Sequence, residues 1–207
     1  DTLSGFAELD YWLTEEARFS LGINWNEELK ESQYAAGGFM GALGQPINRE
    51  STWQSLTYKA LFLWQWSDVN HVSLNVTTGS KAGGFPLSGN CSGVQLTTDE
   101  CAKFQAERVT QYEVTSKNDF VDNRVRLNAT FFWTDYDPYQ VCFQVGISFG
   151  CTTNGSALVR GIELEFSLFP IPEFAIIGNF NILDARVDNH RIKDPLEGTF
   201  LPGTTIR

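Results

Sequence analysis

The sequence is poor in the residues that carry most catalytic and metal chemistry. It has two histidines, four cysteines and one methionine among 207 residues. No CxxC pair is present, so the close-spaced ligands of a structural zinc site are missing. No serine occupies a GxSxG elbow, and Gly37–Gly44 lacks the GK[ST] ending of a phosphate-binding loop. We therefore expect no enzyme and no resident metal or cofactor.

Positive charge and long apolar runs are also scarce. The chain carries 15 Lys and Arg against 25 Asp and Glu, a net charge of −10. Binding to a polyanion requires a basic surface, so we expect no nucleic acid and no anionic membrane as partner. The longest apolar runs, such as Leu61–Trp64 and Phe174–Ile177, are far shorter than the ~20 residues of a membrane helix. We therefore expect no membrane span.

What the sequence contains in abundance is alternation of apolar and polar residues, which is typical of half-buried strands. Phe19, Leu21, Ile23 and Trp25, for example, alternate with polar or small residues. We predict strands at 19–25, 56–66, 71–77, 108–115, 123–134, 140–150, 157–168 and 174–183.

The helical signals are few. Thr97 and Glu100 have the spacing of a capping box, which predicts one short helix at 98–107, and residues 27–35 are a candidate for a further helical turn. Strands that do not alternate with helices favour an all-β fold. We expect an antiparallel β-sandwich or jelly-roll-like domain with one short helix. We expect a single domain at 14–207, preceded by an arm at 1–13.

The cysteines are even in number and predict disulfides. They are Cys91, Cys101, Cys142 and Cys151. If 140–150 is one extended strand, Cys142 and Cys151 lie about 30 Å apart, whereas bridged Cα atoms lie within ~7 Å. We therefore predict two bridges from the 91–101 segment to Cys142 and Cys151. A bend near Gly146 or Gly150 would instead allow two local loops.

Four N-x-S/T triplets predict N-glycosylation. They begin at Asn75, Asn90, Asn128 and Asn154. Asn75 and Asn128 fall on the polar faces of predicted strands, and the other two fall in Gly/Ser-rich turns, so all four are expected to face solvent. Together with the disulfides, they predict N-linked glycans and an extracellular location, secreted or at the cell surface.

The arm 1–13 has the most regular alternation in the chain. Its odd positions are apolar or small, namely Leu3, Gly5, Ala7, Leu9, Tyr11 and Leu13. This pattern resembles the N-terminal donor strand of pilus subunits, which completes the β-sandwich of the next subunit. The resemblance implies a structural subunit that polymerises head-to-tail with copies of itself into a pilus-like extracellular filament. An ordinary first strand, paired within its own chain, is the alternative.

Two further functions remain open from the residues alone. Asp135 and Asp137, among aromatic neighbours, could bind sugar or calcium in a carbohydrate-binding or adhesive β-sandwich, although Asp-Pro is also a common hairpin turn. Glu163 and Glu165, or the Asp135/Asp137 pair, could serve a jelly-roll glycosidase or lyase. Glutamates at alternate positions of a strand also occur on ordinary solvated faces.

Overall fold

The computed structural model describes residues 1–34, 47–85, 103–145, 148–153, 155–190 and 204–206. Within them every regular element is a β-strand and every pairing is antiparallel, which confirms the all-β class. The strands are β1 (Thr2–Trp12), β2 (Ala17–Tyr34), β3 (Ile47–Ser67), β4 (Asn70–Lys81), β5 (Glu107–Phe120), β6 (Val125–Tyr136), β7 (Gln140–Val145), β8 (Ser148–Thr153), β9 (Ser156–Ile171), β10 (Phe174–His190) and β11 (Thr204–Ile206).

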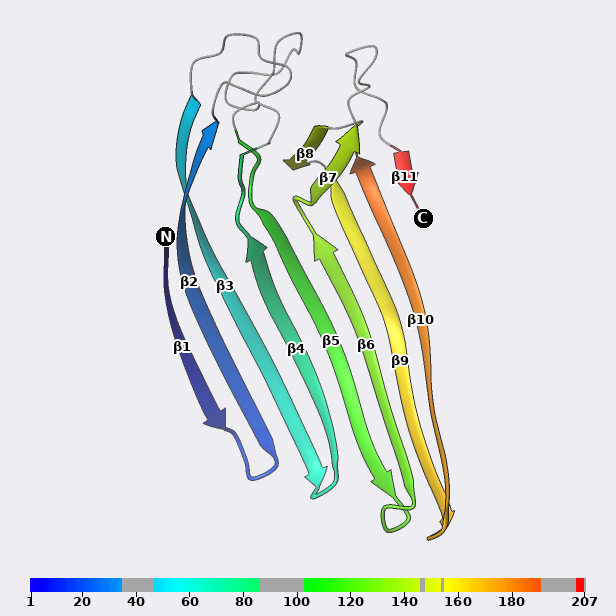
Figure 1. Ribbon diagram of the computed structural model, residues 1–207. Coiled ribbons are helices and arrows are strands. Elements are labelled where there is room, and N and C mark those ends of the chain that lie inside the picture. The colour runs from blue at the N-terminus through cyan, green and yellow to red at the C-terminus, as the bar shows by residue number, and fades with distance from the viewer. Residues whose placement is uncertain (35–46, 86–102, 146–147, 154, 191–203, 207) are drawn as a thin grey trace.

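Nine of the strands form one sheet in the order β1-β2-β3-β4-β5-β6-β9-β10-β11. Each strand pairs with its neighbour in sequence, and the hairpin β7-β8 is inserted between β6 and β9 as a separate two-stranded sheet (Figure 1). The ladders are long. The β2-β3 ladder, for instance, runs without a break from Ala17↔Trp64 to Tyr34↔Ile47. The result is an up-and-down meander of extended hairpins.

The two ends of the sheet differ in their connections. At one end the strands are joined by the short segments 13–16, 68–69, 121–124 and 172–173. At the other end the connections are the long segments 35–46, 82–106, 137–155 and 191–203, which include the β7-β8 hairpin (Figure 1). We call these the short-turn end and the long-loop end.

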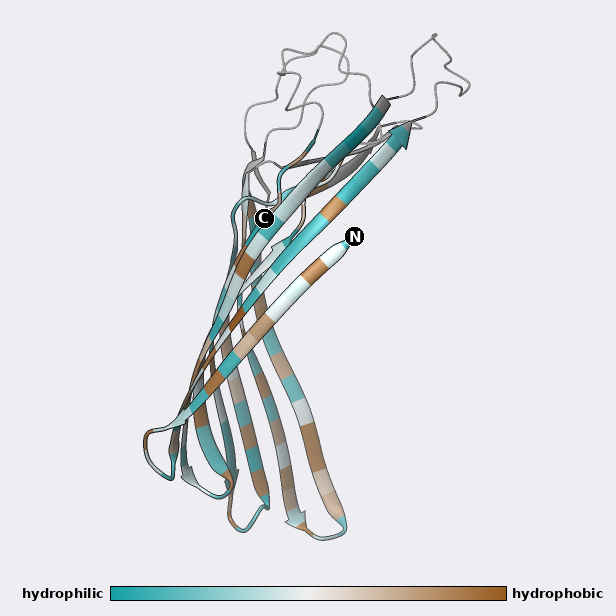
Figure 2. Ribbon diagram, turned by 90° about the vertical axis from the view of Figure 1, so that its left-hand side faces the viewer, coloured by the Kyte–Doolittle hydropathy of each residue, from teal (hydrophilic) through white to brown (hydrophobic). Residues whose placement is uncertain are grey.

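The predicted sandwich is wrong, because the structure has one layer. Ala157, at 6 % exposure, is the only buried apolar residue among those that the structure describes. No second sheet covers the apolar side chains in the described part of the chain, and the single sheet is curved along its length (Figure 2). Alternation tells which side chains share a face, but it does not tell what covers that face.

The predicted helices are wrong where the structure describes them. Residues 27–34 continue β2, because the ladder with β3 runs through them and outweighs their local preference. Phe104 forms an isolated bridge with Gly84, and Glu107 begins β5. Residues 98–102 lie outside the described residues.

The predicted strand 140–150 is also wrong. It divides into β7 and β8, which place Cys142 directly opposite Cys151. Opposed residues in an antiparallel ladder have Cα atoms about 5 Å apart, so the 30 Å separation and the argument built on it no longer apply. Cys91 and Cys101 lie outside the described residues, and the connectivity of the four cysteines stays a prediction.

The arm 1–13 belongs to the sheet of its own chain. β1 pairs with β2 from Thr2↔Glu28 to Trp12↔Arg18, so the donor-strand interpretation is wrong and the alternative holds. The alternation in this segment was real, and its odd positions do share one face. The neighbour that β1 requires is supplied by the same polypeptide.

Candidate functional site: the two faces of one sheet

The registers sort the side chains of the sheet into two faces, because antiparallel partners point to the same side. One face, here the apolar face, is formed by the odd positions of β1, β2 and β6 and the even positions of β3, β4, β5, β9 and β10. A single row across it reads Tyr11, Phe19, Phe62, Leu74, Val114, Phe131, Ile162 and Ile182. The opposite side is the polar face.

The apolar face is open to its surroundings. Leu74 and Phe131, near its centre, are 47 % and 45 % exposed. Each of the strands β1 to β6, β9 and β10 carries large apolar side chains that are exposed on this face. Soluble monomers rarely expose contiguous apolar patches above a few hundred Å², so this face requires an apolar partner that covers it from edge to edge.

The apolar residues form a band that crosses the strands obliquely. On β2 the band ends at Trp25, two residues before Glu27, and on β10 it ends at Ile182, two residues before Asp184. The register from Ile182 leads to Phe19 of β2, so the edge shifts by about six residues over roughly six strand spacings. With ~3.3 Å per residue and ~4.8 Å between strands, the strands tilt about 35° from the normal of the band.

Tryptophan and tyrosine residues gather toward both edges of the band. Trp64 and Trp66, with ring centroids 5.5 Å apart, lie near the short-turn end of β3, and Tyr58 lies toward its other edge. Tyr112 and Trp133, which are cross-strand partners, mark the long-loop edge on β5 and β6. Aliphatic residues such as Leu9, Leu21 and Leu74 lie between these levels. Two aromatic levels that flank an aliphatic zone are typical of strands that cross a bilayer.

The polar face holds hydrogen-bonded side chains. Thr115 Oγ1 donates to Glu113 Oε1 at 3.2 Å and lies 3.2 Å from Thr130 Oγ1, while Gln111 donates to the second oxygen of Glu113 at 3.2 Å. Asn128 donates to Glu165 at 3.4 Å. The most buried side chains of the main sheet, Ser20, Thr115, Thr134 and Ala157, all lie on this face. Over the central strands the polar face is crowded and the apolar face is exposed, which makes the polar face the concave one. On the outer strands β1 and β10, Phe6, Ile177 and Leu183 are exposed on the polar face.

Several residues singled out from the sequence meet on the polar face. Asn75, Asn128, Glu163 and Glu165 all point to it, from β4, β6 and β9. Asp135 lies on the apolar face instead. Asp137 follows β6, and its backbone N–H donates to the carbonyl of Arg108 on β5 at 3.0 Å, which extends the ladder between the two strands. Asn90 and Asn154 lie outside the described residues.

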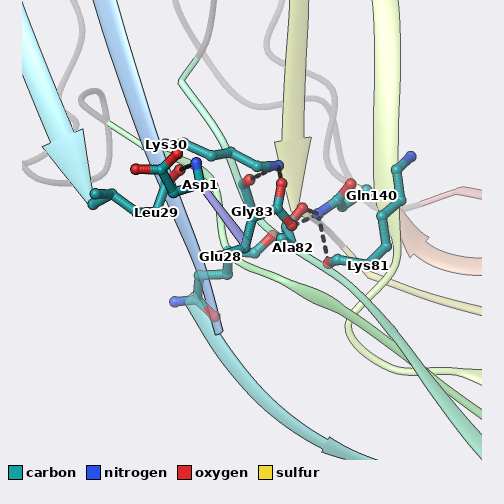
Figure 3. A network of polar contacts seen from close by, with 9 residues as sticks. Asp1, Glu28, Leu29, Lys30, Lys81, Ala82, Gly83 and Gln140 are labelled. Atoms are coloured by element: carbon teal, nitrogen blue, oxygen red, sulfur yellow. Dashed lines mark hydrogen bonds and ion pairs between the residues drawn. The ribbon is translucent and has the colours of Figure 1, made fainter. Parts of the chain in front are cut away.

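At the long-loop end, Gln140 joins two of the long connections to the sheet. Its side-chain amide donates to the carbonyls of Lys81 and Ala82 at 3.4 and 3.1 Å (Figure 3). The same amide donates to the carbonyl of Gln105 at 2.8 Å, and the backbone N–H donates to the carboxylate of Glu107 at 2.8 Å. The side chain is only 6 % exposed.

Lys30 reaches the same segment from β2. Its ammonium group donates to the carbonyl of Gly83 at 2.9 Å and forms an ion pair with Glu28 at 3.2 Å (Figure 3). Lys30, Gln140 and Phe104 are among the residues that line a cavity of about 450 Å³. These contacts fix the bases of the long connections over the polar face.

The described residues contain no helix that could span a membrane, and no cluster of three or more His, Cys, Asp or Glu side chains placed to hold a metal ion. The apolar face is the functional feature that the sequence interpretation missed. Its signal was present in the sequence as long alternating segments separated by connections that are short at one end and long at the other.

A family comparison identifies the sheet. Residues 1–205 match the family described as TonB dependent receptor-like, beta-barrel. The chain belongs to this family. Since members of the family are receptors and transporters, the expectation that the chain is not an enzyme is confirmed.

Solved structures agree at the level of the fold. The ferric yersiniabactin uptake receptor FyuA from Yersinia pestis is similar with a TM-score of 0.67 and 20 % identity, over 94 % of this chain and 32 % of that one. The siderophore receptor PiuA from Acinetobacter baumannii gives a TM-score of 0.70 and 17 % identity, over 97 % and 27 %. The copper transporter OprC gives 0.62 and 13 %, over 90 % and 32 %. The chain spans about a third of the length of these structures.

The family overturns the filament interpretation. The similar solved structures are receptors and not pilus subunits, so the resemblance to pilus subunits and the predicted homopolymer are wrong. The two alternative functions, an adhesive β-sandwich and a glycosidase or lyase, are wrong as well. The expected partners are wrong too, because neither copies of the chain nor N-linked glycans are supported as partners. The family is one of membrane proteins. The cell-surface part of the expected location holds, and secretion is not supported.

Proposed function

We propose that this chain forms part of the wall of an outer-membrane β-barrel that imports a metal chelate. The observation that carries the proposal is the exposed apolar band on a single antiparallel sheet, in a chain matched by the receptor family over residues 1–205. In a bilayer the band faces lipid tails, which cover it from edge to edge. The strand tilt of about 35° lies at the lower end of the ~35–45° range of outer-membrane barrels.

The asymmetry of the connections supports an orientation. Outer-membrane barrels have short turns on the periplasmic side and longer loops on the extracellular side. The segments 13–16, 68–69, 121–124 and 172–173 then face the periplasm, and the loops fixed by Gln140 face outward. The cavity at the base of those loops lies where an incoming ligand first meets the barrel.

The concave polar face fits the lumen of such a barrel. The lumen of a large outer-membrane transporter is polar and is filled by a plug, and barrels of this class have about 22 strands. The strands described here therefore supply only a part of the circumference. The free edge of β1 carries unpaired N–H and C=O groups, which inside a bilayer must be paired by a further strand.

The cargo we propose is ferric iron bound to a siderophore. FyuA is a ferric yersiniabactin uptake receptor, PiuA is a siderophore receptor, and BauA from Acinetobacter baumannii is the ferric preacinetobactin receptor. The polar face and the loop-end cavity offer hydrogen-bonding groups but no cluster of metal ligands in the described residues. Such a surface suits a metal that arrives already enclosed in its chelator.

The test is uptake by cells that produce the full-length protein. Cells with and without its gene are supplied with radioactive iron bound to yersiniabactin, to a catecholate siderophore or to citrate, and cell-associated iron is counted. We expect uptake of at least one siderophore chelate to require the gene and to stop when TonB is removed. Uptake that is the same with and without the gene for every chelate would contradict the proposal.

A further inference from the structure

A cluster of charged residues stands on the apolar face at the long-loop edge of the band. Arg160 on β9 and Asp184 on β10 are direct cross-strand partners, and Arg186 lies two residues after Asp184 on the same face. On this face, toward the long-loop end, Arg160 lies two residues from Ile162, and Asp184 lies two residues from Ile182, the last apolar residue of the face on β10. Leu158 lies beyond Arg160 on β9. On β10 the cluster therefore marks the point where the band ends and polar surroundings begin.

The two guanidinium groups share a single carboxylate oxygen. Arg160 donates to Asp184 Oδ2 from Nε at 3.0 Å and from Nη2 at 2.9 Å, and Arg186 donates to the same oxygen from Nη2 at 3.0 Å. A guanidinium group has five N–H donors, so one oxygen leaves most of them free. The side chains of Arg160 and Arg186 are 37 % and 30 % exposed, which leaves those donors accessible.

An aromatic ring completes the cluster. The guanidinium carbon of Arg160 lies 5.2 Å from the ring centroid of Trp133, its cross-strand partner on β6. A cation at this distance from an aromatic ring is attracted by the ring, which helps to hold the guanidinium group in place. Trp133 belongs to the aromatic level at the long-loop edge, where aromatic rings of membrane proteins lie among lipid headgroups.

We propose that Arg160 and Arg186, supported by Trp133, bind the phosphate of a lipid headgroup in the leaflet on the long-loop side. The inference rests on the proposed function, because it takes the apolar band as the lipid-facing surface. Acyl chains lie on the band beside Ile162 and Ile182, which places the headgroup of the same lipid at the height of the arginines. Guanidinium groups bind phosphate through paired N–H donors, and basic clusters at the membrane surface recruit anionic lipids.

The acidic residues nearby set the strength of the site. Asp184 neutralises one of the two arginines, and its fixed position keeps both guanidinium groups side by side. Asp135, on β6 next to Trp133, lies on the same face, and it forms no ion pair with either arginine. Its charge repels a phosphate, so its removal strengthens binding.

The experiment uses the full-length protein, purified in a nonionic detergent and titrated with lipid A, a glycolipid with two phosphates. Bound lipid is counted by native mass spectrometry. We expect the double variant Arg160→Gln/Arg186→Gln to bind about thirtyfold more weakly, since each basic residue at a membrane surface contributes about 1 kcal/mol. Asp135→Asn is expected to bind about fivefold more tightly.

Two controls define the site. Arg126→Gln removes an arginine that is paired with Asp119 on the polar face, and it is expected to leave binding unchanged. Inorganic phosphate at millimolar concentration should not displace the lipid, because it lacks the acyl chains that lie on the band. Displacement by phosphate, or equal loss in Arg126→Gln and the double variant, would overturn the proposal.

The failure of this inference can be told from failure of the proposed function. If the protein is recovered from the outer membrane and Asp135→Asn and the double variant both bind lipid A as the unaltered protein does, only the lipid site is wrong. If the protein is not recovered from the outer membrane at all, the proposed function fails and the site with it. Asp135→Asn leaves the arginine cluster intact, so the lipid A affinity of this variant tests the proposed site even if the double variant does not fold.

Discussion

The ring of Phe132 lies over Gly161, its direct cross-strand partner on the polar face. A Cβ atom at position 161 would lie 2.8 Å from Cζ of Phe132 and 2.5 Å from the carbonyl oxygen of Ile182, closer than packed carbon atoms approach. The ring occupies the space that a side chain at 161 would take, and so covers the backbone of β9. Gly178 and Phe166 repeat the arrangement on the apolar face.

Gly161→Ala is therefore expected to destabilise the protein by about 1–3 kcal/mol, because the added methyl group displaces the ring or the neighbouring strand. Thermal unfolding of the full-length protein in detergent measures the effect. Gly5→Ala is the matched control, since nothing lies within 4 Å of a Cβ built on Gly5. Equal midpoints for the two variants would contradict the packing described for Phe132.

Gln140→Leu is expected to loosen the long connections without unfolding the sheet. The substitution keeps the volume of the side chain but removes the amide donors to the carbonyls of Lys81, Ala82 and Gln105, so three part-buried hydrogen bonds are lost. Limited proteolysis should then cut segment 82–106 or 137–155 several times faster than in the unaltered protein. Unchanged cleavage rates would show that other contacts fix these connections. Gln54→Leu, whose exposed amide contacts Glu27 at 2.6 Å, serves as the control.

The register of β7 and β8 gives a prediction for the cysteines. Since Cys142 and Cys151 are directly opposed, their backbones satisfy the distance that a disulfide requires. We expect peptide mapping without reduction to recover a peptide pair that joins Cys142 to Cys151. Recovery of either cysteine joined to Cys91 or Cys101 would instead support the crossed arrangement predicted from the sequence.

The local structure was predictable from the sequence to a large extent. Alternation placed strands at 19–25, 56–66 and 157–168, and each lies within an observed strand. It failed at 140–150, because the alternation of apolar residues continues unbroken through the reversal between Val145 and Ser148. It failed at 27–35 as well, because the pairing that extends β2 depends on residues far away in the sequence.

The environment of the sheet was not predictable by the same reasoning. Leu9 and Tyr11 read as one apolar face of a strand whether a second sheet or a lipid tail covers them. The expectation of no membrane span rested on the absence of ~20 consecutive apolar residues, the length that a membrane-spanning helix requires. A strand that crosses a bilayer needs only about ten residues, and every second one of them faces the lumen. Polar residues such as Glu8 and Asp10, which alternate with the apolar residues of β1, therefore keep the band from appearing as a long apolar run.

The central claim is that the apolar face lies against lipid, and Leu74 and Asn75 test it most directly. They are neighbours at the middle of β4, and they point to the apolar and the polar face respectively. In full-length protein assembled in lipid vesicles, Leu74→Arg is expected to lower the free energy of unfolding by about 2–4 kcal/mol, the cost of an arginine at the bilayer midplane, while Asn75→Arg changes it little. Leu74 is 47 % exposed, so an arginine there would be nearly neutral if the face met water. Equal stability of the two variants in vesicles would contradict the account.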